Sequence, residues 1–201
     1  MCIRDRLALR LSRAVGRLDE SEEKRHCEAL LRLPEQIEQI LENEELFKLV
    51  AERFSKASSI FFIGRGLDYS ISLEGSLKLK EISYIKSEAY AAGELKHGTI
   101  SLIEPGTPVF AVATQPDLFE KTLGNIREVK SRGAYVAALV GEDCENAGEF
   151  SDVAIKVPST LPEYMPSLNV VPLQLIAYFT AVERGCDVDK PRNLAKSVTV
   201  E

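Results

Sequence analysis

Three charged side chains with the spacing of one helical face lie between residues 74 and 81. Glu74, Lys78 and Glu81 are separated by i, i+4 and i+7, so all three project from the same side of a helix. A carboxylate held beside an amine could transfer a proton in acid–base catalysis. The alternative is a solvated ladder of ion pairs, because Glu followed by Lys four residues later is an ordinary helix-stabilising pair. Spacing alone leaves both interpretations open.

A histidine follows in a segment that is too irregular for a long helix. His97 lies between Gly93 and Gly98, and an imidazole presented by such a loop titrates near neutral pH and can move a proton. A lone histidine is more often structural, and the sequence by itself does not decide between these roles.

The C-terminal stretch PRNLAKSVTVE, residues 191–201, begins with a proline that ends the preceding helix, and it is too polar to be a core strand. Disorder is the simple expectation for an exposed terminus. However, Leu194, Val198 and Val200 could anchor the tail on the folded domain. A docked tail would bring the amine of Lys196 to a cleft, where it could attack a ketone.

The elements that must position these side chains alternate between strands and helices. Short β-branched and aromatic runs, each followed by Gly or Pro, predict strands at 58–64, 108–114, 134–141 and 152–158, with a weaker one at 87–91. Helical stretches are expected at 68–86, 117–132 and 166–184. This alternation predicts a three-layer αβα sandwich with a mainly parallel five-stranded sheet, and function at the carboxyl ends of the strands.

The turn IGRG, residues 63–66, follows the first expected strand, where glycines allow backbone N–H groups to approach an anion. The third glycine of a dinucleotide fingerprint would fall at Tyr69, so that class of cofactor is disfavoured and no cofactor is expected. A tight turn required only by the topology explains the glycines about equally well.

The chain before this α/β region reads as helical. Apolar residues at helical spacing between Leu7 and Ser55 predict two or three helices, with residues 19–23 linking two of them and Pro34 in the first turn of another. We therefore expect an N-terminal helical segment at 1–55, an α/β domain at 56–190 and a C-terminal tail at 191–201.

Composition disfavours several classes of function. The net charge of −6 and the pI near 5.2 do not fit a general nucleic-acid or anionic-membrane surface. We expect no apolar run to approach the roughly 18 to 20 residues that span a membrane. The four cysteines lack the paired spacing of zinc or redox sites, and the N-terminus lacks a secretory signal. A cytoplasmic protein with reduced thiols and no metal site is expected.

Three stretches together resemble one enzyme family. GRGLDYSISLEGSLKLKEISYI, SEAYAAGELKHG and PRNLAKSVTVE are similar to the isomerase half of glutamine:fructose-6-phosphate aminotransferase, and the likeness extends from about Leu7 to Glu201. The resemblance implies a sugar-isomerase (SIS) fold and a reaction in which ammonia and fructose 6-phosphate give glucosamine 6-phosphate. It places the chain in the C-terminal portion of such an enzyme, with its second SIS subdomain.

The resemblance also implies roles for individual residues. His97 matches the histidine that opens the sugar ring, acting in the neighbouring subunit's site of a homodimer. Lys196 matches the lysine that forms a Schiff base with the C2 ketone, and Glu81 matches the carboxylate that moves a proton between C1 and C2. Lys78 matches the lysine that supports this carboxylate or the open-chain sugar, and Ala195 is assigned with it to substrate binding.

The sequence also differs from the family in two places, and these differences limit the activity that we expect. The chain has no counterpart of the Ser/Thr-rich loop that holds the sugar phosphate in that family's first SIS subdomain. Its start, MCIRDR, has no counterpart at this point of the family and does not match the cysteine nucleophile of the glutaminase domain. We expect the 201 residues alone, without those two parts, to have little or no activity. The alternatives are a stand-alone SIS module that binds a sugar phosphate without catalysis, and a related deglycase or isomerase.

Overall fold

The structure, a computed structural model, describes residues 3–192 and is built around a sheet of five parallel strands. The strand order is β2-β1-β3-β4-β5. The strands are β1 (Ser59–Gly64), β2 (Lys86–Ala91), β3 (Pro108–Ala113), β4 (Tyr135–Gly141) and β5 (Val153–Val157). Each lies where the sequence predicts a strand, and the weakest prediction becomes the edge strand β2. The mainly parallel five-stranded sheet is therefore confirmed.

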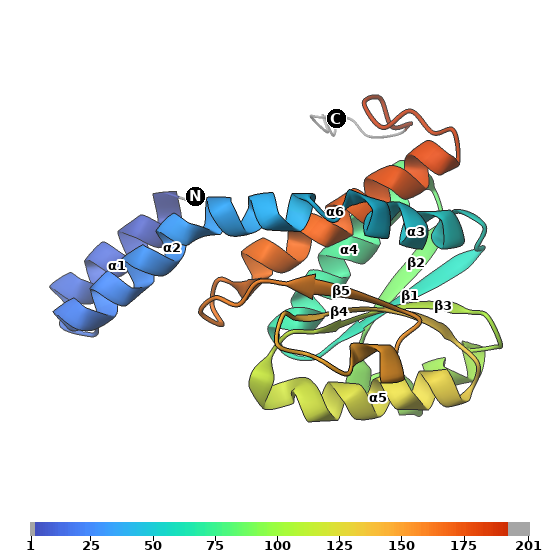
Figure 1. Ribbon diagram of the computed structural model, residues 1–201, viewed down its shortest axis with the longest axis horizontal. Coiled ribbons are helices and arrows are strands. Elements are labelled where there is room, and N and C mark those ends of the chain that lie inside the picture. Colours follow the sequence, from blue (N-terminus) through green and yellow to red (C-terminus); the bar gives the residue numbers. More distant parts are fainter. Residues whose placement is uncertain (1–2, 193–201) are drawn as a thin grey trace, which may run out of the picture.

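Helices cover both faces of the sheet (Figure 1). One face carries α3 (Glu44–Ser55), α4 (Leu67–Ser83) and α6 (Met165–Glu183), and the other carries α5 (Phe119–Ser131). Alternate residues of each strand enter the two resulting cores, because successive side chains point to opposite faces. Phe62 and Phe110 belong to the first core, and Phe61 and Val109 belong to the second. The three-layer αβα sandwich is confirmed.

Short helices of the 3-10 type lie in the connections that follow β2, β3 and β4. After β2 come η1 (Ala92–His97) and η2 (Thr99–Leu102), so the segment around His97 is irregular, as predicted. The remaining two are η3 (Pro116–Leu118), which precedes α5, and η4 (Ala147–Glu149), which precedes β5.

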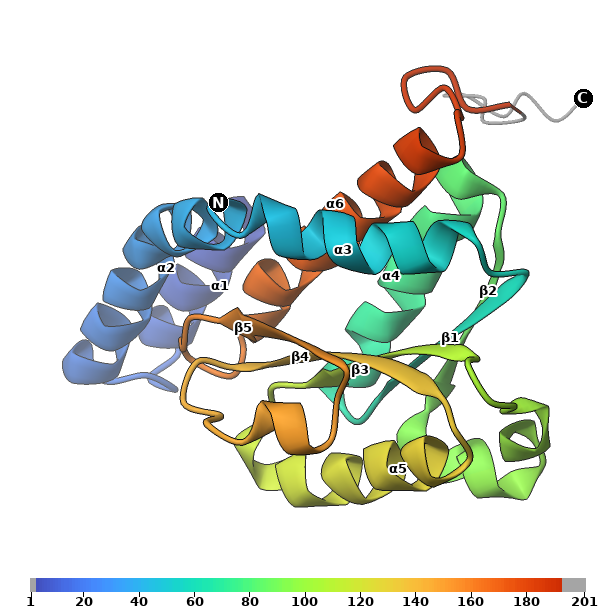
Figure 2. The ribbon, with the colours of Figure 1, turned by 45° about the vertical axis from the view of Figure 1, so that its right-hand side comes forward.

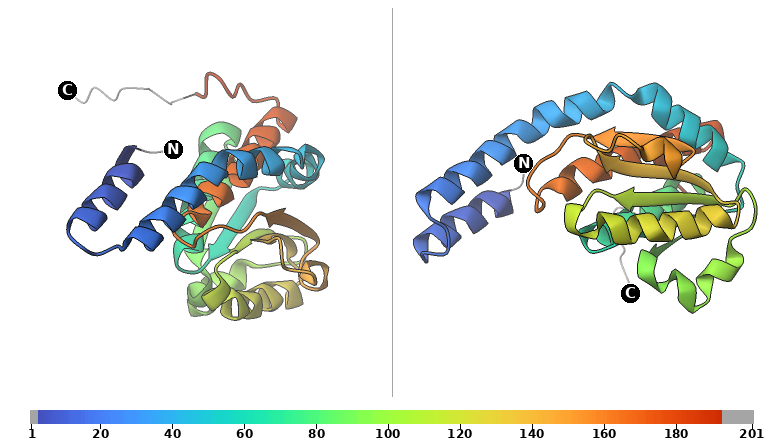
Figure 3. Two further views of the ribbon diagram at one scale, coloured as in Figure 1. Left: turned by 60° about the vertical axis from the view of Figure 1, so that its left-hand side comes forward. Right: turned by 60° about the horizontal axis from the view of Figure 1, so that its bottom comes forward.

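The N-terminal region contains the predicted helices, although two details of the prediction are wrong. α1 (Ile3–Ala14) and α2 (Glu20–Leu41) form a hairpin that extends beyond the sheet layers (Figure 3). Residues 19–23 are not the link, because Asp19 caps α2 by a reciprocal pair of hydrogen bonds with Glu22. Pro34 lies inside α2, and the buried residues Leu33 and Ile40 on either side of it stabilise the continuous helix against the lost hydrogen bond.

Helix α6 corrects the expectation about apolar length. By length and composition it is the one helix within residues 3–192 that could cross a membrane. Half of its apolar window is buried, however, and it packs against α3 and α4 with Leu168 and Ile176 in the core. In this fold α6 serves as the central helix of one layer.

Candidate functional site

The turn between β1 and α4 requires its two glycines for steric reasons. A Cβ on Gly64 would lie 2.6 Å from the backbone carbonyl carbon and oxygen of Asp68, and Gly66 has a φ of +55°. The buried carboxylate of Asp68 accepts hydrogen bonds from the backbone N–H groups of Thr114, at 2.8 Å, and Gln115, at 3.2 Å. Because a carboxylate already occupies the first turn of α4, the tight-turn interpretation of IGRG is favoured over an anion site.

The charged face predicted on α4 is present. Nζ of Lys78 lies 2.7 Å from Oε2 of Glu81 and 3.7 Å from Oε1 of Glu74. The side chain of Glu81 is 25% exposed and that of Lys78 is 34% exposed, so neither is a fully solvated surface charge. The hydrogen bond to Glu81 raises the pKa of Lys78, since it stabilises the ammonium form. The ammonium in turn holds the Glu81 carboxylate in one orientation.

This charged face does not lie at the carboxyl ends of the strands, although the sequence predicts functional residues there. α4 begins at the carboxyl end of β1 and runs back along the sheet, so Glu81 lies about 20 Å along the helix from its start. β2 then begins at Lys86, five residues further on. Glu81 therefore lies near the amino ends of β1 and β2. The expectation was wrong because these charges belong to the returning helix and not to a loop after a strand.

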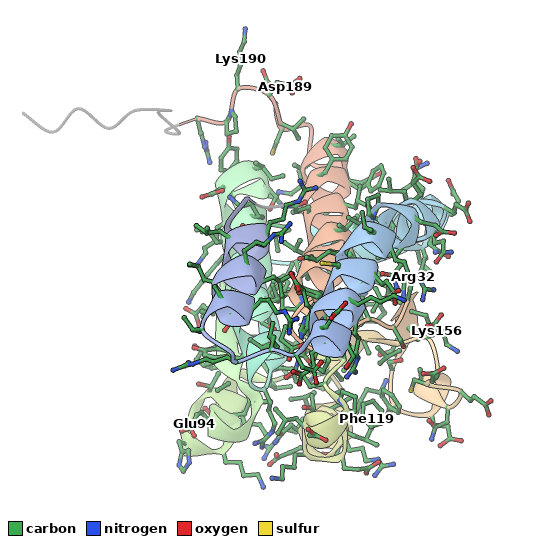
Figure 4. The ribbon with its side chains drawn as sticks, turned by 90° about the vertical axis from the view of Figure 1, so that its left-hand side faces the viewer. Arg32, Glu94, Phe119, Lys156, Asp189 and Lys190 are labelled. Atoms are coloured by element: carbon green, nitrogen blue, oxygen red, sulfur yellow. The ribbon has the colours of Figure 1, made fainter. Side chains whose placement is uncertain are left out.

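His97 lies on the α5 side of the sheet, because the neighbouring Leu95 is buried in the second core and Nζ of Lys96 lies 3.9 Å from Oε2 of Glu128 in α5. It ends η1, which follows the carboxyl end of β2, and its side chain is 74% exposed with Nε2 3.8 Å from Oε2 of Glu94. α4, which carries Glu81, packs on the other face, with Leu79 in the first core. Figure 4 shows Glu94 at one end of the molecule and Asp189 and Lys190, which precede the tail, at the other. One chain alone does not bring His97 and Glu81 into one site.

Lys196 and Ala195 lie outside the described residues, but the segment that leads to them is described. The guanidinium of Arg184 donates hydrogen bonds to the backbone oxygens of Ser83, at 3.0 Å, and Ser55, at 2.8 Å. These carbonyls lie at the ends of α4 and α3, where helix carbonyls need partners. Further on, the backbone N–H of Arg192 donates to Oη of Tyr84 at 2.8 Å. The tail therefore begins beside the end of α4 that carries Lys78 and Glu81 (Figure 2).

An open cavity of about 710 Å³ lies at the carboxyl ends of β3 and β4. Its lining includes Gln115 and Pro116 of the loop after β3, and the acidic residues Asp143 and Glu145. Carboxylates repel a phosphate, so this cavity does not replace the missing Ser/Thr-rich phosphate loop. In the part of the chain from residue 3 to 192, no group of three or more His, Cys, Asp or Glu side chains is arranged to hold a metal ion.

The parallel sheet with the order 2-1-3-4-5, covered on both faces by helices, defines a doubly wound α/β domain. A family model described as "SIS domain" matches residues 53–184, and the chain belongs to this family.

Similar proteins agree with this assignment. The chain is 58% identical over 172 residues to the isomerizing glutamine–fructose-6-phosphate aminotransferase of Caldanaerobacter subterraneus subsp. tengcongensis, covering 86% of this chain and 28% of the relative. It is 52% identical over 195 residues to the protein of the same name from Clostridium tetani, covering 97% of this chain and 32% of the relative. The chain thus spans about a third of the length of these relatives.

Two solved structures show how far the similarity of fold extends. The C-terminal domain of glucosamine-fructose-6-phosphate aminotransferase from Francisella tularensis superposes with a TM-score of 0.87 at 33% identity, covering 92% of this chain and 52% of that chain. A glucosamine-6-phosphate deaminase from Thermotoga maritima superposes with a TM-score of 0.62 at 27% identity, covering 94% of this chain and 52% of that chain. The chain is therefore similar to a C-terminal segment of an aminotransferase with a SIS fold.

Proposed function

We propose that this chain forms the sugar-converting C-terminal part of an isomerizing glutamine–fructose-6-phosphate aminotransferase. The reaction would convert fructose 6-phosphate and ammonia derived from glutamine to glucosamine 6-phosphate, a step of amino-sugar synthesis. Because the chain spans about a third of its relatives, this activity is proposed for a longer protein that contains it. The observation that carries the proposal is the partly buried Lys78–Glu81 pair beside the origin of the segment that contains Lys196.

The proposed chemistry needs an amine and a base. The amine of Lys196 would add to the C2 ketone of the open-chain sugar and expel its oxygen as water, leaving an iminium ion. Ammonia would then add to C2 and release the amine of Lys196, so that the nitrogen of ammonia stays on C2 as an imine. Removal of a proton from C1 and delivery of a proton to C2 convert this imine to an amino-aldose. Glu81 is suited to this proton shift, because the ammonium of Lys78, 2.7 Å away, holds its carboxylate in place.

The geometry of one chain supports a homodimeric site. His97 is exposed on the other side of the sheet from Glu81, so ring opening by His97 in the same active site would require a second subunit. Leu73 and Leu77, on the charged side of α4, are 46% and 43% exposed. Apolar side chains exposed beside a charged pair fit a surface that another part of the protein covers. We therefore propose that His97 acts in trans.

Two further points complete the proposal. The cytoplasm is the proposed location of the protein, in keeping with the unpaired thiols of Cys27, Cys144 and Cys186.

A stand-alone module that only binds a sugar phosphate is less well supported, because the described residues supply no Ser/Thr-rich loop for the phosphate.

Isotope transfer tests the proposed reaction directly. The protein that contains this chain is incubated with fructose 6-phosphate and glutamine labelled with ¹⁵N in its amide, and the sugar product is analysed by mass spectrometry. The proposal requires the label at the amino group of glucosamine 6-phosphate. A folded protein that binds fructose 6-phosphate but forms no labelled amino sugar would contradict it and would favour the binding module.

A further inference from the structure

Tyr84 has an unusual backbone conformation at the end of α4. Its φ is +60°, and it is the one residue other than glycine with a positive φ between residues 3 and 192. Its N–H bonds to the backbone oxygen of Lys80 at 3.2 Å, which ends the helix. Glycine usually occupies such a position, because a Cβ disfavours the left-handed conformation. A tyrosine in this conformation raises the question of what its side chain contacts.

The side chain of Tyr84 contacts Arg192, which lies 108 residues further along the chain. Its Oη accepts a hydrogen bond from the backbone N–H of Arg192 at 2.8 Å. The guanidinium carbon of Arg192 lies 4.0 Å from the centroid of the ring, a distance typical of a cation–π contact. Tyr84 thus uses both its polar tip and its aromatic face on one residue.

The chain between α6 and Arg192 is also held by specific contacts. Arg184 binds the carbonyls at the ends of α3 and α4, and the carboxylate of Asp187 accepts hydrogen bonds from the N–H groups of Asp189 and Lys190, both at 3.0 Å. The Tyr84 contact comes last along the described part of this segment. It holds Arg192, the last residue that the structure describes.

We infer that Tyr84 is a positioning residue that fixes the origin of the C-terminal tail, and thereby limits where the amine of Lys196 can act. This inference rests on the proposed function. Four residues lead from Arg192 to Lys196, a reach of at most about 14 Å for extended chain. Tyr84 follows Glu81 by three residues, about one helical turn. A contact that holds Arg192 beside Tyr84 would thus limit the reach of the lysine to the neighbourhood of the Lys78–Glu81 pair, and loss of the contact would lengthen that reach.

Limited proteolysis of the 201-residue chain tests the anchoring without reference to catalysis. Trypsin must take up the Arg192 side chain to cut after it, which requires Arg192 to leave the Tyr84 ring. Cleavage after exposed Arg17, in the turn between α1 and α2, serves as the internal reference. Tyr84→Gly keeps the helix end without strain and removes both contacts, whereas Tyr84→Phe keeps only the ring. We expect the Arg192 to Arg17 cleavage ratio to rise about tenfold in Tyr84→Gly and about threefold in Tyr84→Phe.

The second readout follows the lysine in the longer protein that contains this chain. Reduction with borohydride in the presence of fructose 6-phosphate should trap a sugar adduct at Lys196. We expect Tyr84→Gly to slow adduct formation and lower kcat about tenfold, with KM for fructose 6-phosphate within about twofold and Tm unchanged, and Tyr84→Phe to be intermediate.

The two readouts separate the two claims. A faster cleavage after Arg192 together with slower adduct formation supports the positioning role. An unchanged cleavage ratio in Tyr84→Gly overturns it, whatever the kinetics. If Tyr84→Gly and wild type form the adduct at the same rate despite faster cleavage, the anchoring is real but does not position the lysine, and the inference is overturned. If the wild type forms no adduct, the proposed function fails, and cleavage then reports on the anchoring alone.

Discussion

Lys78 stands between two carboxylates of the same helix at unequal distances, with Nζ 2.7 Å from Glu81 and 3.7 Å from Glu74. The two glutamates therefore form a matched pair for mutation, because Glu→Gln removes one charge from the same face in each case. Only the nearer carboxylate has the proposed proton-shuttle role.

Glu81→Gln should lower the rate of glucosamine 6-phosphate formation by about a thousandfold, since an amide cannot accept the C1 proton. Glu74→Gln should lower it by less than about threefold, because it removes only the longer ion pair. Both rates are measured in the protein that contains this chain, with circular dichroism to check folding. An equal loss of rate in the two variants would indicate that the charged face of α4 is an ordinary ladder of ion pairs without a role in proton transfer.

The proposed action of His97 in trans predicts complementation between two inactive variants. Mixed dimers of Glu81→Gln and His97→Asn subunits contain one site with both native residues, so random mixing should restore about a quarter of the wild-type activity. The measurement is product formation after the two variants are dissociated and reassociated together. If the mixture stays as inactive as each variant alone, His97 acts within its own chain or not in the reaction.

Two glycines should respond in opposite directions to the same substitution. Gly64→Ala should lower the free energy of unfolding by about 3 kcal/mol, since its Cβ would meet backbone atoms of Asp68 at 2.6 Å. Gly124→Ala, in the interior of α5 with no atom within 4 Å of the added Cβ, should raise it by about 0.5 to 1 kcal/mol. Urea unfolding measures both. A neutral Gly64→Ala would show that the turn after β1 is looser than described.

Asp68 should give the stability of this chain a measurable pH dependence. Burial raises the pKa of Asp68, although the hydrogen bonds from Thr114 and Gln115 act in the opposite direction. Because the pKa in the folded state is above the unfolded value, the contribution of this group is full below about pH 3.8 and is lost as pH rises through the folded pKa.

Asp68→Asn removes this titration. Its amide oxygen can still accept from the N–H groups that bond to Oδ2, but its NH2 would replace Oδ1, which accepts hydrogen bonds from Oγ1 of Thr114, at 2.7 Å, and Nδ2 of Asn169, at 3.3 Å. The substitution should destabilise the fold by about 1 to 3 kcal/mol, with the difference from wild type shrinking as pH rises from 4 to 7. Urea unfolding at several pH values measures this difference. A difference that grows with pH would show that the hydrogen bonds outweigh burial and lower the pKa of Asp68.

Much of the fold follows from local patterns in the sequence. The apolar strand runs and the Gly and Pro residues after them predicted all five strands and the helices α4, α5 and α6 to within a few residues. The i, i+4, i+7 spacing correctly grouped Glu74, Lys78 and Glu81, because helical periodicity is a local property.

Features set by tertiary contacts were not predictable in the same way. The edge of the sheet on which Glu81 lies depends on how far α4 runs back before β2 begins. Pro34 stays inside α2 because packing outweighs the lost hydrogen bond. The role of Tyr84 could not be predicted from the sequence, because neither Gly nor Asn marks the end of α4. The residue that Tyr84 contacts, Arg192, is also distant in sequence.

The most direct test of the proposed function is covalent trapping at Lys196. In the protein that contains this chain, borohydride added with fructose 6-phosphate should reduce the Schiff base and leave a sugar adduct that peptide mass spectrometry assigns to Lys196. Lys196→Arg keeps the positive charge but loses the titratable amine, so it should give no adduct and no sugar conversion while glutamine hydrolysis continues. Turnover of fructose 6-phosphate by Lys196→Arg at the wild-type rate, with no adduct in the wild type, would contradict the account.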